Sequence, residues 1–310
     1  MTLSLACLTS SGIVLSADSR QTYRNNANMT RIGTDSAFKL FQLSSKVGIV
    51  IAGRAFFPDG KGVLKNTGWY IEEFKRSSLP ANGSVKEIAS ALNDYLVSAF
   101  LDPEVVRLHE GLTSNILAAG GKDVVFKARE KLSVPYSYTD KDGKAIENQW
   151  SIDTISFIVA GYDSDGIGRA YLTIVPEGPA IERTTESGAP LWIGQTDIVA
   201  RILKGYGWEI NALEFVKDAR SQGKKVDDEL NKMEYLFNWG TMTLQDAVDF
   251  CVLMTRMTEG IQRFSDGTVM NPGGIPGVGG HVNVATITSD EGFQWINKRN
   301  LVIGASEQNA

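Results

Sequence analysis

Thr2 stands directly behind the initiator Met1, at the head of a strand-like run. Once Met1 is removed, Thr2 carries a hydroxyl nucleophile and a free α-amine on one residue. The amine has an ordinary pKa of roughly 7.7–8, far closer to neutrality than the roughly 10.4 of a lysine. It can therefore act as general base for the adjacent hydroxyl, an arrangement that nucleophilic catalysis uses. No propeptide precedes Thr2, so we expect removal of Met1 to be the only maturation step.

The elements that must position this residue begin with two hairpins. Residues 2–9 and 13–17 predict two strands joined at Gly12, and residues 38–43 and 47–53 predict two more around a turn at Ser44, Ser45 and Lys46. A helix is predicted from Ser84, because Glu87 follows at the spacing of a capping box and apolar residues then recur every three or four positions.

In the second half of the chain, strands again come first and helices follow them, before two final strands. Strands are predicted over residues 154–160, 169–175 and 191–194, helices over 196–205 and 242–264, and final strands over 281–287 and 292–300. Blocks of strands followed by blocks of helices favour antiparallel sheets with helices layered outside them, rather than alternating βαβ units. We found no internal repeat.

Several of these segments resemble one family. The run Gly12–Thr22, which contains Ala17-Asp18-Ser19-Arg20, resembles the opening of proteasome β-type subunits, as does Lys39 placed 14 residues before Gly53. The helix start at Ser84 and the strand end Gly161-Tyr162-Asp163 also fall where that family has them. The chain is therefore identified as similar to the N-terminal-nucleophile (Ntn) hydrolases of the proteasome β type and their bacterial relatives.

The resemblance implies a fold and a domain organisation. The expected fold is α+β, a four-layer α/β/β/α sandwich of two antiparallel sheets. We expect a single domain over residues 2–310, with insertions near 101–150, 205–240 and 266–280. Relatives assemble into rings, so a homo-oligomer is expected as well, with a regulatory ATPase as a candidate partner.

The resemblance also implies catalytic roles. Thr2 would attack a peptide carbonyl to form an acyl-enzyme. Lys39 would lower the pKa of the Thr2 hydroxyl, and Asp18 would keep Lys39 protonated and oriented. The backbone N–H of Gly53 would stabilise the oxyanion, and Ser265 aligns with a further active-site position of the family. From spacing alone, Asp18 and Lys39 are equally compatible with a core ion pair, and Gly53 with a tight turn.

The resemblance also implies a substrate-binding site. Gln21 and Thr22 match the edge strand that pairs with an extended peptide. The residues matching the specificity pocket are mostly apolar, so the resemblance favours a hydrophobic side chain before the scissile bond; Phe41 and Ile51 are equally compatible with ordinary core positions. The full predicted substrate site is Gln21, Thr22, Ala37, Phe41, Ile51 and Ala55.

Two positions near the expected α-amine depart from the family pattern. Gln195 stands where the family has a Ser near the N-terminal amine, and Gln262 stands at the position of an Asp. Asp266 lies close by and could substitute, while the amide oxygen of Gln195 could accept a hydrogen bond from the amine. These positions are therefore the candidates for supporting the α-amine.

Composition limits the remaining function classes. The net charge of −5 provides no basic footprint for nucleic acid. No apolar run reaches the roughly 20 residues of a membrane span, and no signal peptide is recognisable. Two cysteines and two histidines make neither a disulfide framework nor a zinc site, so we expect a cytoplasmic protein without metal or organic cofactor.

The predicted function is a threonine-type peptidase that cleaves peptides or unfolded proteins. Two alternatives stay open. One is a non-catalytic proteasome-like scaffold subunit, against which the joint presence of Thr2, Asp18 and Lys39 argues. The other is a different amide-bond chemistry on the same fold, either small-molecule amidohydrolysis or transpeptidation in which an amine replaces water.

Overall fold

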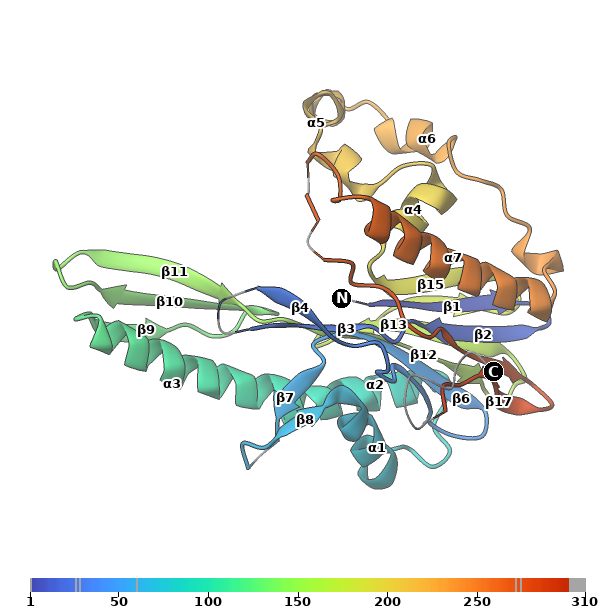
Figure 1. The fold of residues 1–310 in the computed structure, drawn as a ribbon, viewed down its shortest axis with the longest axis horizontal. Helices are drawn as coiled ribbons and strands as arrows, with labels where there is room; N and C mark the ends of the chain where they lie inside the picture. Colours follow the sequence, from blue (N-terminus) through green and yellow to red (C-terminus); the bar gives the residue numbers. More distant parts are fainter. Residues whose placement is uncertain are drawn as a thin grey trace, which may run out of the picture. The chain divides into compact units, whose positions relative to one another are not determined.

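The computed structural model describes residues 2–25, 27, 29–59, 61–270, 272–273 and 275–300. By its internal contacts the chain divides into two compact units (Figure 1). The first unit comprises Met1–Ala52, Ala160–Ala170 and Arg183–Ala310, and the second comprises Gly53–Val159 and Tyr171–Glu182. The predicted single domain over residues 2–310 stays a prediction.

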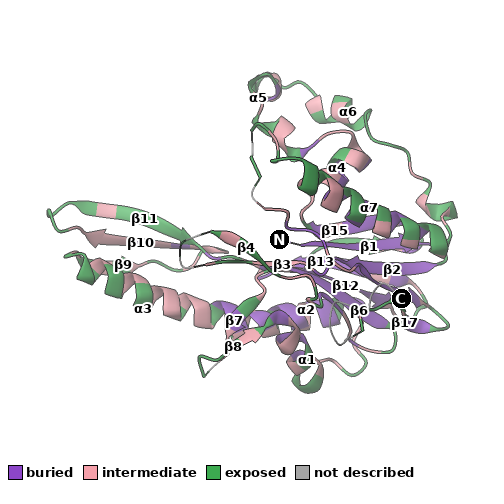
Figure 2. Cartoon of the chain, viewed as in Figure 1, coloured by how far each residue is buried: buried purple, intermediate pink, exposed green. Residues whose placement is uncertain are grey.

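The centre of the first unit is a five-stranded antiparallel sheet in the order β15-β1-β2-β16-β17. Its strands are β1 (Leu3–Thr9), β2 (Gly12–Ala17), β15 (Ala189–Gly194), β16 (Asn283–Thr288) and β17 (Gly292–Asn297). β1 and β2 form the predicted hairpin, in which Ser4 pairs with Ala17. Both strands are buried along their whole length (Figure 2), which explains their nearly continuous apolar sequence.

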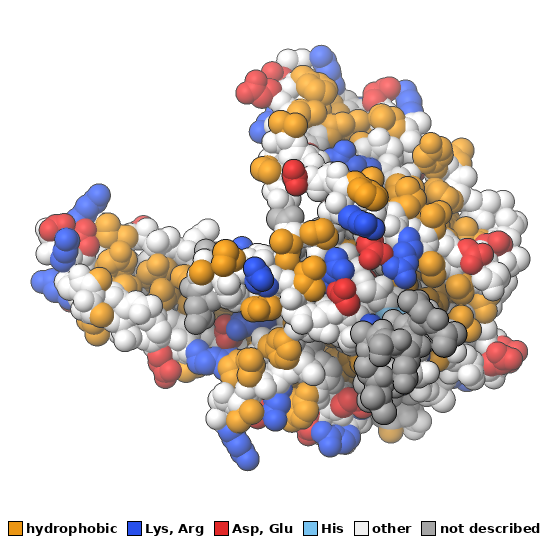
Figure 3. All heavy atoms as spheres, viewed as in Figure 1, with side chains coloured by type: hydrophobic (Ala, Val, Ile, Leu, Met, Phe, Trp, Pro, Cys, Tyr) orange, Lys and Arg blue, Asp and Glu red, His pale blue; other side chains and the backbone are white. Residues whose placement is uncertain are grey.

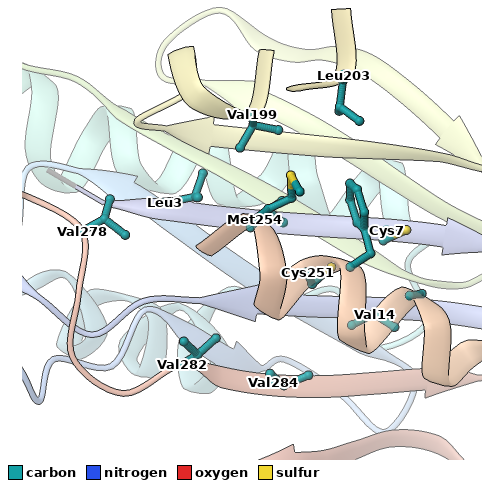
Figure 4. Packing of buried hydrophobic residues seen from close by; sticks show 13 residues of the cluster. Leu3, Cys7, Val14, Val199, Leu203, Cys251, Met254, Val278, Val282 and Val284 are labelled. Carbon is teal, nitrogen blue, oxygen red and sulfur yellow. The ribbon is translucent and has the colours of Figure 1, made fainter. Parts of the chain in front are cut away.

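Two helices cover one face of this sheet, α4 (Asp197–Lys204) and α7 (Leu244–Phe264). Thr243 caps α7 through a capping box with Asp246. The buried side of α7 packs against β1 and β2, and Val199 and Leu203 of α4 join the same hydrophobic cluster (Figure 4). Burial of one apolar face is the main source of helix stability in proteins, so the sheet stabilises both helices.

The other face of the sheet meets the second predicted hairpin, β5 (Leu40–Gln42) and β6 (Val47–Gly53). Gly48 makes this approach close, because a Cβ atom there would lie 2.7 Å from Cδ1 of Leu15. The Ser4 hydroxyl donates to the Ile51 carbonyl at 3.0 Å. β5 and β6 belong to a five-stranded sheet in the order β14-β13-β12-β6-β5. Its other strands are β12 (Ile155–Tyr162), β13 (Gly168–Ile174) and β14 (Gly178–Thr184).

The rest of the first unit is made of short elements. β3 (Gln21–Arg24) and β4 (Thr30–Thr34) form a two-stranded ribbon. The predicted insertion near 205–240 contains 3₁₀ turns η2 (Trp208–Ala212) and η3 (Trp239–Thr241) and helices α5 (Glu214–Ser221) and α6 (Val226–Asn231).

The second unit is built on helices. α1 (Thr67–Ser77) packs beside α2 (Val85–Leu96), and α2 runs through a π-helical turn η1 (Val97–Leu101) into α3 (Asp102–Ala118). Ser84 and Glu87 form the predicted capping box of α2. The ribbon β7 (Phe56–Pro58) and β8 (Leu64–Asn66) contributes Phe57, whose ring stacks 4.0 Å from Tyr70 and 4.4 Å from Phe100.

The predicted insertion near 101–150 contains α3 and a three-stranded antiparallel sheet in the order β11-β10-β9. Its strands are β9 (Lys122–Phe126), β10 (Ser133–Thr139) and β11 (Ala145–Ser151). No residue of α3 is fully buried. His109 of α3 stacks on Phe126 of β9 with ring centroids 3.9 Å apart, so an aromatic contact joins helix and sheet.

The mixed α/β composition and the antiparallel sheets are confirmed, while the stacking into four layers stays a prediction. No helix among the described residues is long and apolar enough to cross a membrane.

Candidate functional site

The β1–β2 hairpin brings Thr2 and Asp18 to the same end of the central sheet. Thr2 immediately precedes β1 and Asp18 immediately follows β2, and the register places these two ends side by side. The Leu3 N–H donates to Oδ1 of Asp18 at 3.0 Å, and the Asp18 N–H donates to the Leu3 carbonyl at 3.2 Å. The first strand is thus held by the carboxylate at its N-terminal end.

Lys39 reaches the same carboxylate from the segment before β5. Its Nζ donates to Oδ1 of Asp18 at 2.8 Å and to the Arg20 carbonyl at 2.5 Å. The Ile51 N–H donates to the Lys39 carbonyl at 2.9 Å, which ties Lys39 to β6. One oxygen of Asp18 therefore joins the N-terminal strand to the lysine.

The second oxygen of Asp18 binds the far end of the chain. Oδ2 accepts the N–H groups of Arg20 and Gly279, each at 3.1 Å. The Gly279 carbonyl in turn accepts the N–H groups of Ser19 and Arg20 at 3.1 and 2.9 Å. The carboxylate thus receives four hydrogen bonds from segments that lie far apart in the sequence, which makes it the organising group of the site.

Burial dominates the electrostatics of the Asp18–Lys39 pair. Both residues are buried. Loss of solvation raises the pKa of Asp18, and the charge of Lys39 opposes that rise. Loss of solvation likewise lowers the pKa of Lys39, against the charge of Asp18. Both pKa shifts favour the neutral forms, and the charge of each partner opposes the shift of the other.

Thr2 itself is enclosed. It is 5% exposed, and its carbonyl accepts the Gln195 N–H at 2.6 Å. Gly194, at the end of β15, makes this contact sterically allowed: its φ is +92°, and a Cβ atom there would lie 1.9 Å from the Thr2 carbonyl oxygen. Only glycine fits, so Gly194 shapes the surroundings of Thr2 although the sequence analysis assigned it no role.

The two glutamines predicted to support the α-amine bind each other. Nε2 of Gln262 donates to Oε1 of Gln195 at 3.0 Å. Oε1 of Gln262 accepts the N–H groups of Gly277 and Val278, both at 2.9 Å. Gln262 of α7 thus links Gln195, the residue after β15, to the segment 277–279. Gly279 of this segment donates one of the hydrogen bonds to Asp18.

Ser265 and Asp266 lie at the C-terminal end of α7. The Ser265 hydroxyl donates to the Ile261 carbonyl at 2.8 Å, so it satisfies one of the terminal carbonyls of the helix. The carbonyl of Asp266 accepts the Gly273 N–H at 2.6 Å, and both residues are exposed. The hydrogen bonds found at this end of α7 are those of a helix terminus.

The predicted substrate-binding residues of the first unit occupy three elements. Gln21 and Thr22 lie in β3, opposite Thr34 and Ile32 of β4. Ala37 donates its N–H to the Ser19 carbonyl at 3.0 Å. Ile51 of β6 is buried and Phe41 of β5 is half-buried. The backbones of Ala37 and Ile51 therefore bond directly to the chain around Asp18 and Lys39.

Gly53 and Ala55 belong to the second unit. Gly53 has φ +110°, and a Cβ atom there would lie 2.2 Å from the Thr154 carbonyl oxygen, so a close backbone approach requires glycine. The Ala55 carbonyl accepts the Thr67 N–H at the start of α1. Their predicted roles toward Thr2 stay predictions.

Sequence reasoning missed the ion pair that supports the site. Arg20 makes two hydrogen bonds to the Asp35 carboxylate, at 2.7 and 2.9 Å, and the Ser19 hydroxyl donates to the Asp35 carbonyl at 2.7 Å. The Arg20 contact lowers the pKa of Asp35. The sequence run Asp18-Ser19-Arg20 could have indicated this contact. Each of its three side chains makes a hydrogen bond to another segment of the first unit. Among the described residues, no group of three His, Cys, Asp or Glu side chains is arranged to hold a metal ion.

Comparison with known proteins gives matches to solved structures alone. No family model matches the chain, and no curated protein does. "Anbu (ancestral beta-subunit)" from Yersinia bercovieri is 14% identical, with 96% of this chain and 88% of that chain covered and a TM-score of 0.45. Anbu from Hyphomicrobium sp. strain MC1 is 13% identical, with coverage of 96% and 86% and a TM-score of 0.44. The Pseudomonas aeruginosa protein, described as a "Helical Assembly of the Anbu Complex", is 15% identical, with coverage of 98% and 88% and a TM-score of 0.47.

These matches correct the family assignment. They name Anbu, a proteasome-related but distinct family, so assignment to the proteasome β-type Ntn hydrolases is wrong. The likeness assigns no residue role to this chain. The resemblance was misleading for a physical reason: Asp18 and Lys39 join two hairpins through a buried ion pair, and such a contact can serve the fold whether or not Thr2 reacts.

Proposed function

We propose that this chain is a non-catalytic, proteasome-like subunit of a larger assembly. One observation carries the proposal: the groups expected to serve Thr2 are engaged in structural contacts. Lys39 is bonded to Asp18 and to the Arg20 carbonyl, and the acceptor oxygen of Gln195 already receives a hydrogen bond from a neighbouring side chain.

In this proposal the Asp18–Lys39 pair has a structural role. A buried carboxylate that accepts four hydrogen bonds fixes the strand ends around it, and the charge of its lysine partner favours the ionised form. The proposed subunit uses the antiparallel sheets as a rigid frame, stacked in four layers with helices outside, and presents helix surfaces to other copies.

Covalent labelling tests the proposal. Purified protein is incubated with a β-lactone that acylates nucleophilic threonines, and intact mass is measured before and after. The proposal predicts no adduct, in wild type or in Thr2→Ala. A one-to-one adduct on wild type that disappears in Thr2→Ala, but persists in the matched core variant Thr9→Ala, would establish a reactive Thr2 and reject the non-catalytic role.

The second candidate is threonine-dependent hydrolysis of amide bonds. It is favoured by a specific observation, namely that a single oxygen of Asp18 contacts both Lys39 and the N–H that follows Thr2. Thr2 Oγ would attack the amide carbonyl while its proton passes to the α-amine. The amide C–N bond would then break, and the α-amine would give that proton to the departing amine, leaving an ester on Thr2. Water would hydrolyse this ester, releasing the carboxylic acid and restoring the Thr2 hydroxyl. The candidate substrate is a peptide or an unfolded protein, in which case a regulatory ATPase becomes a candidate partner.

An added amine distinguishes hydrolysis of the amide bond from transpeptidation. A short peptide is incubated with wild type in the presence of a second amine, and the products are identified by mass. Hydrolysed product alone indicates a peptidase, and ligated product indicates transpeptidation. Absence of both from wild type, with Met1 shown to be removed, rejects the second candidate.

A further inference from the structure

The segment 277–281, which leads into β16, lies against the Asp18-Ser19-Arg20 run, and we call it the strap. Val278 within the strap and Val282 directly after it are buried in the hydrophobic cluster of the first unit (Figure 4). Between these two anchors, the Gly279 N–H donates to Asp18 and the Gly279 carbonyl accepts two N–H groups of the run. Opening of the strap would therefore remove both a donor and an acceptor from the surroundings of Asp18.

Two glycines allow the strap to pack closely against the run. A Cβ atom on Gly279 would lie 2.6 Å from Cζ of Arg20. Gly280 has φ +76°, and a Cβ atom there would lie 2.8 Å from both the Ser19 hydroxyl oxygen and the Asp35 carbonyl oxygen. A side chain at either position would push the strap outward, so the closed strap depends on the absence of side chains there.

The junction of the strap with β16 leaves two buried polar atoms without a hydrogen bond among the described residues. These atoms are Nε2 of His281 and Nδ2 of Asn283. Asn283 is 1% exposed, and its Oδ1 accepts the Arg299 N–H at 3.2 Å. A buried polar atom without a partner costs free energy that is recovered when water reaches it. This cost favours opening of the strap at its β16 end.

Two arginines flank His281. Arg256 of α7 donates to the carbonyl of Gly280, the preceding residue, at 3.1 Å, and Arg299 follows β17. Burial and the charge of Arg299 lower the pKa of His281, and Arg256 adds to the shift, whereas a hydrogen bond with Asn297 opposes it. The closed strap therefore favours the neutral imidazole.

The acidic side chains on this side of the first unit are already paired with arginines. Glu259 of α7 binds Arg256, and Asp35 binds Arg20. Positive and negative side chains lie intermixed over the C-terminal half of α7 and the segment that leads into β16 (Figure 3). Both carboxylates are thus engaged, and a protonated His281 would add a positive charge without a counter-ion of its own.

We propose that the strap is a pH-sensitive switch that opens when His281 is protonated. Protonation makes both ring nitrogens donors, and the described residues around the closed strap provide no acceptor for Nε2. Asp18, against which the strap lies, is already paired with Lys39. In the open strap, water solvates the charged ring. The inference concerns the frame around Asp18 and holds whether or not Thr2 reacts.

Acid should open the strap, because the pKa of His281 is lower in the closed strap than in water, where it is roughly 6.5. The open strap therefore binds the proton more tightly than the closed one. The closed strap loses stability as the pH falls below roughly 6.5, and the loss is complete below the pKa of the closed state.

Hydrogen exchange of the full chain, measured by mass spectrometry at about pH 7.5 and about pH 5.5, tests the switch. After correction for intrinsic rates, protection of the amides of residues 277–279 should fall severalfold at the lower pH, by at most about tenfold per pH unit below 6.5. Protection of the central strand β2 should stay constant, which distinguishes opening of the strap from unfolding of the sheet.

Three variants separate the titration of His281 from other effects of acid. His281→Asn keeps a polar side chain beside Asn297 but cannot titrate, so its strap should be equally protected at both pH values. The matched control is His109→Asn on α3, which should keep the response of the wild type. Gly280→Ala provides the reference for an open strap and should lower protection at both pH values, because its φ and the nearby Asp35 carbonyl disfavour a side chain.

Titration of the wild-type imidazole rings by NMR tests the same proposal without a change at His281. The His281 ring should titrate below roughly 6.5. A midpoint at or above that value, equal protection of residues 277–279 at both pH values in wild type, or the same acid response in His281→Asn overturns the switch.

Discussion

At the residue scale, the Asp18 carboxylate connects the beginning, the first hairpins and the C-terminal part of the described chain. Four N–H donors surround it, and the lysine among them is itself buried. Removal of one member of a buried ion pair leaves an uncompensated charge in the core, which costs much more than loss of an exposed pair. We therefore expect changes to Asp18 or Lys39 to cost more stability than changes to exposed ion pairs.

Lys39→Met should lower the free energy of unfolding by about 3–5 kcal/mol, because it leaves the buried Asp18 carboxyl without its cation. Urea denaturation measures the loss. The matched control is Lys75→Met, which removes an exposed ion pair with Glu72 and should cost no more than about 1 kcal/mol.

The double variant Asp18→Asn/Lys39→Met completes the test. It removes both charges, so it should be less destabilised than the sum of the two single variants. Equal losses for Lys39→Met and Lys75→Met would show that the buried pair contributes no special stability.

At the element scale, short-range signals locate those elements whose ends are set by local hydrogen bonds. The capping boxes at Ser84 and at Thr243 begin α2 and α7, and the apolar runs of the first hairpins become β1, β2, β5 and β6. α7 covers the central sheet, so its capping affects the packing of the first unit.

Thr243→Ala should destabilise the first unit by about 1 kcal/mol, because the hydroxyl accepts the Asp246 N–H at 3.2 Å and alanine cannot. Thermal unfolding should show a fall in melting temperature of about 2–4 °C. Thr241→Ala, in the preceding 3₁₀ turn, is the control and should change it by less. A Thr243→Ala variant as stable as Thr241→Ala would exclude a stabilising cap.

Long-range contacts explain what the sequence could not predict. The polar stretch 29–34 has no apolar pattern that predicts a strand, yet Thr30–Thr34 forms β4 because it pairs with β3. Residues 101–150 show no single periodicity, because α3 is nowhere fully buried and the three strands rely on one another. At the candidate site, Asp18 and Lys39 were recognisable from their neighbours in the sequence. Gly279 was not, since its role arises only when residues 261 positions apart meet.

At the scale of the whole molecule, the first unit has one continuous core between its central sheet and its helices. Cys7 of β1 and Cys251 of α7 lie in that core as free, fully buried thiols (Figure 4). A hydrogen bond with Cys7, together with burial, raises the pKa of the Cys251 thiol. Thiol reagents react with the thiolate, so neither group reacts while the core is closed.

Both thiols should therefore become reactive only when the first unit unfolds. Reaction with an aromatic disulfide in increasing urea should follow the unfolding transition, with two thiols released together. Val269→Cys places a third thiol at a fully exposed position and should react at once without denaturant. Rapid reaction of the native wild type would indicate local opening between α7 and β1.

The pairing of β2 with β16 has a consequence for biosynthesis. β2 is complete by Ala17, whereas the strand that covers its free edge begins at Asn283. At translation rates of about 5–20 residues per second, the nascent hairpin waits on the order of 10–50 seconds for this partner. During that interval an apolar, unpaired edge is exposed on the ribosome, a hazard for aggregation. The central sheet can close only once β16 has left the ribosome and paired with β2.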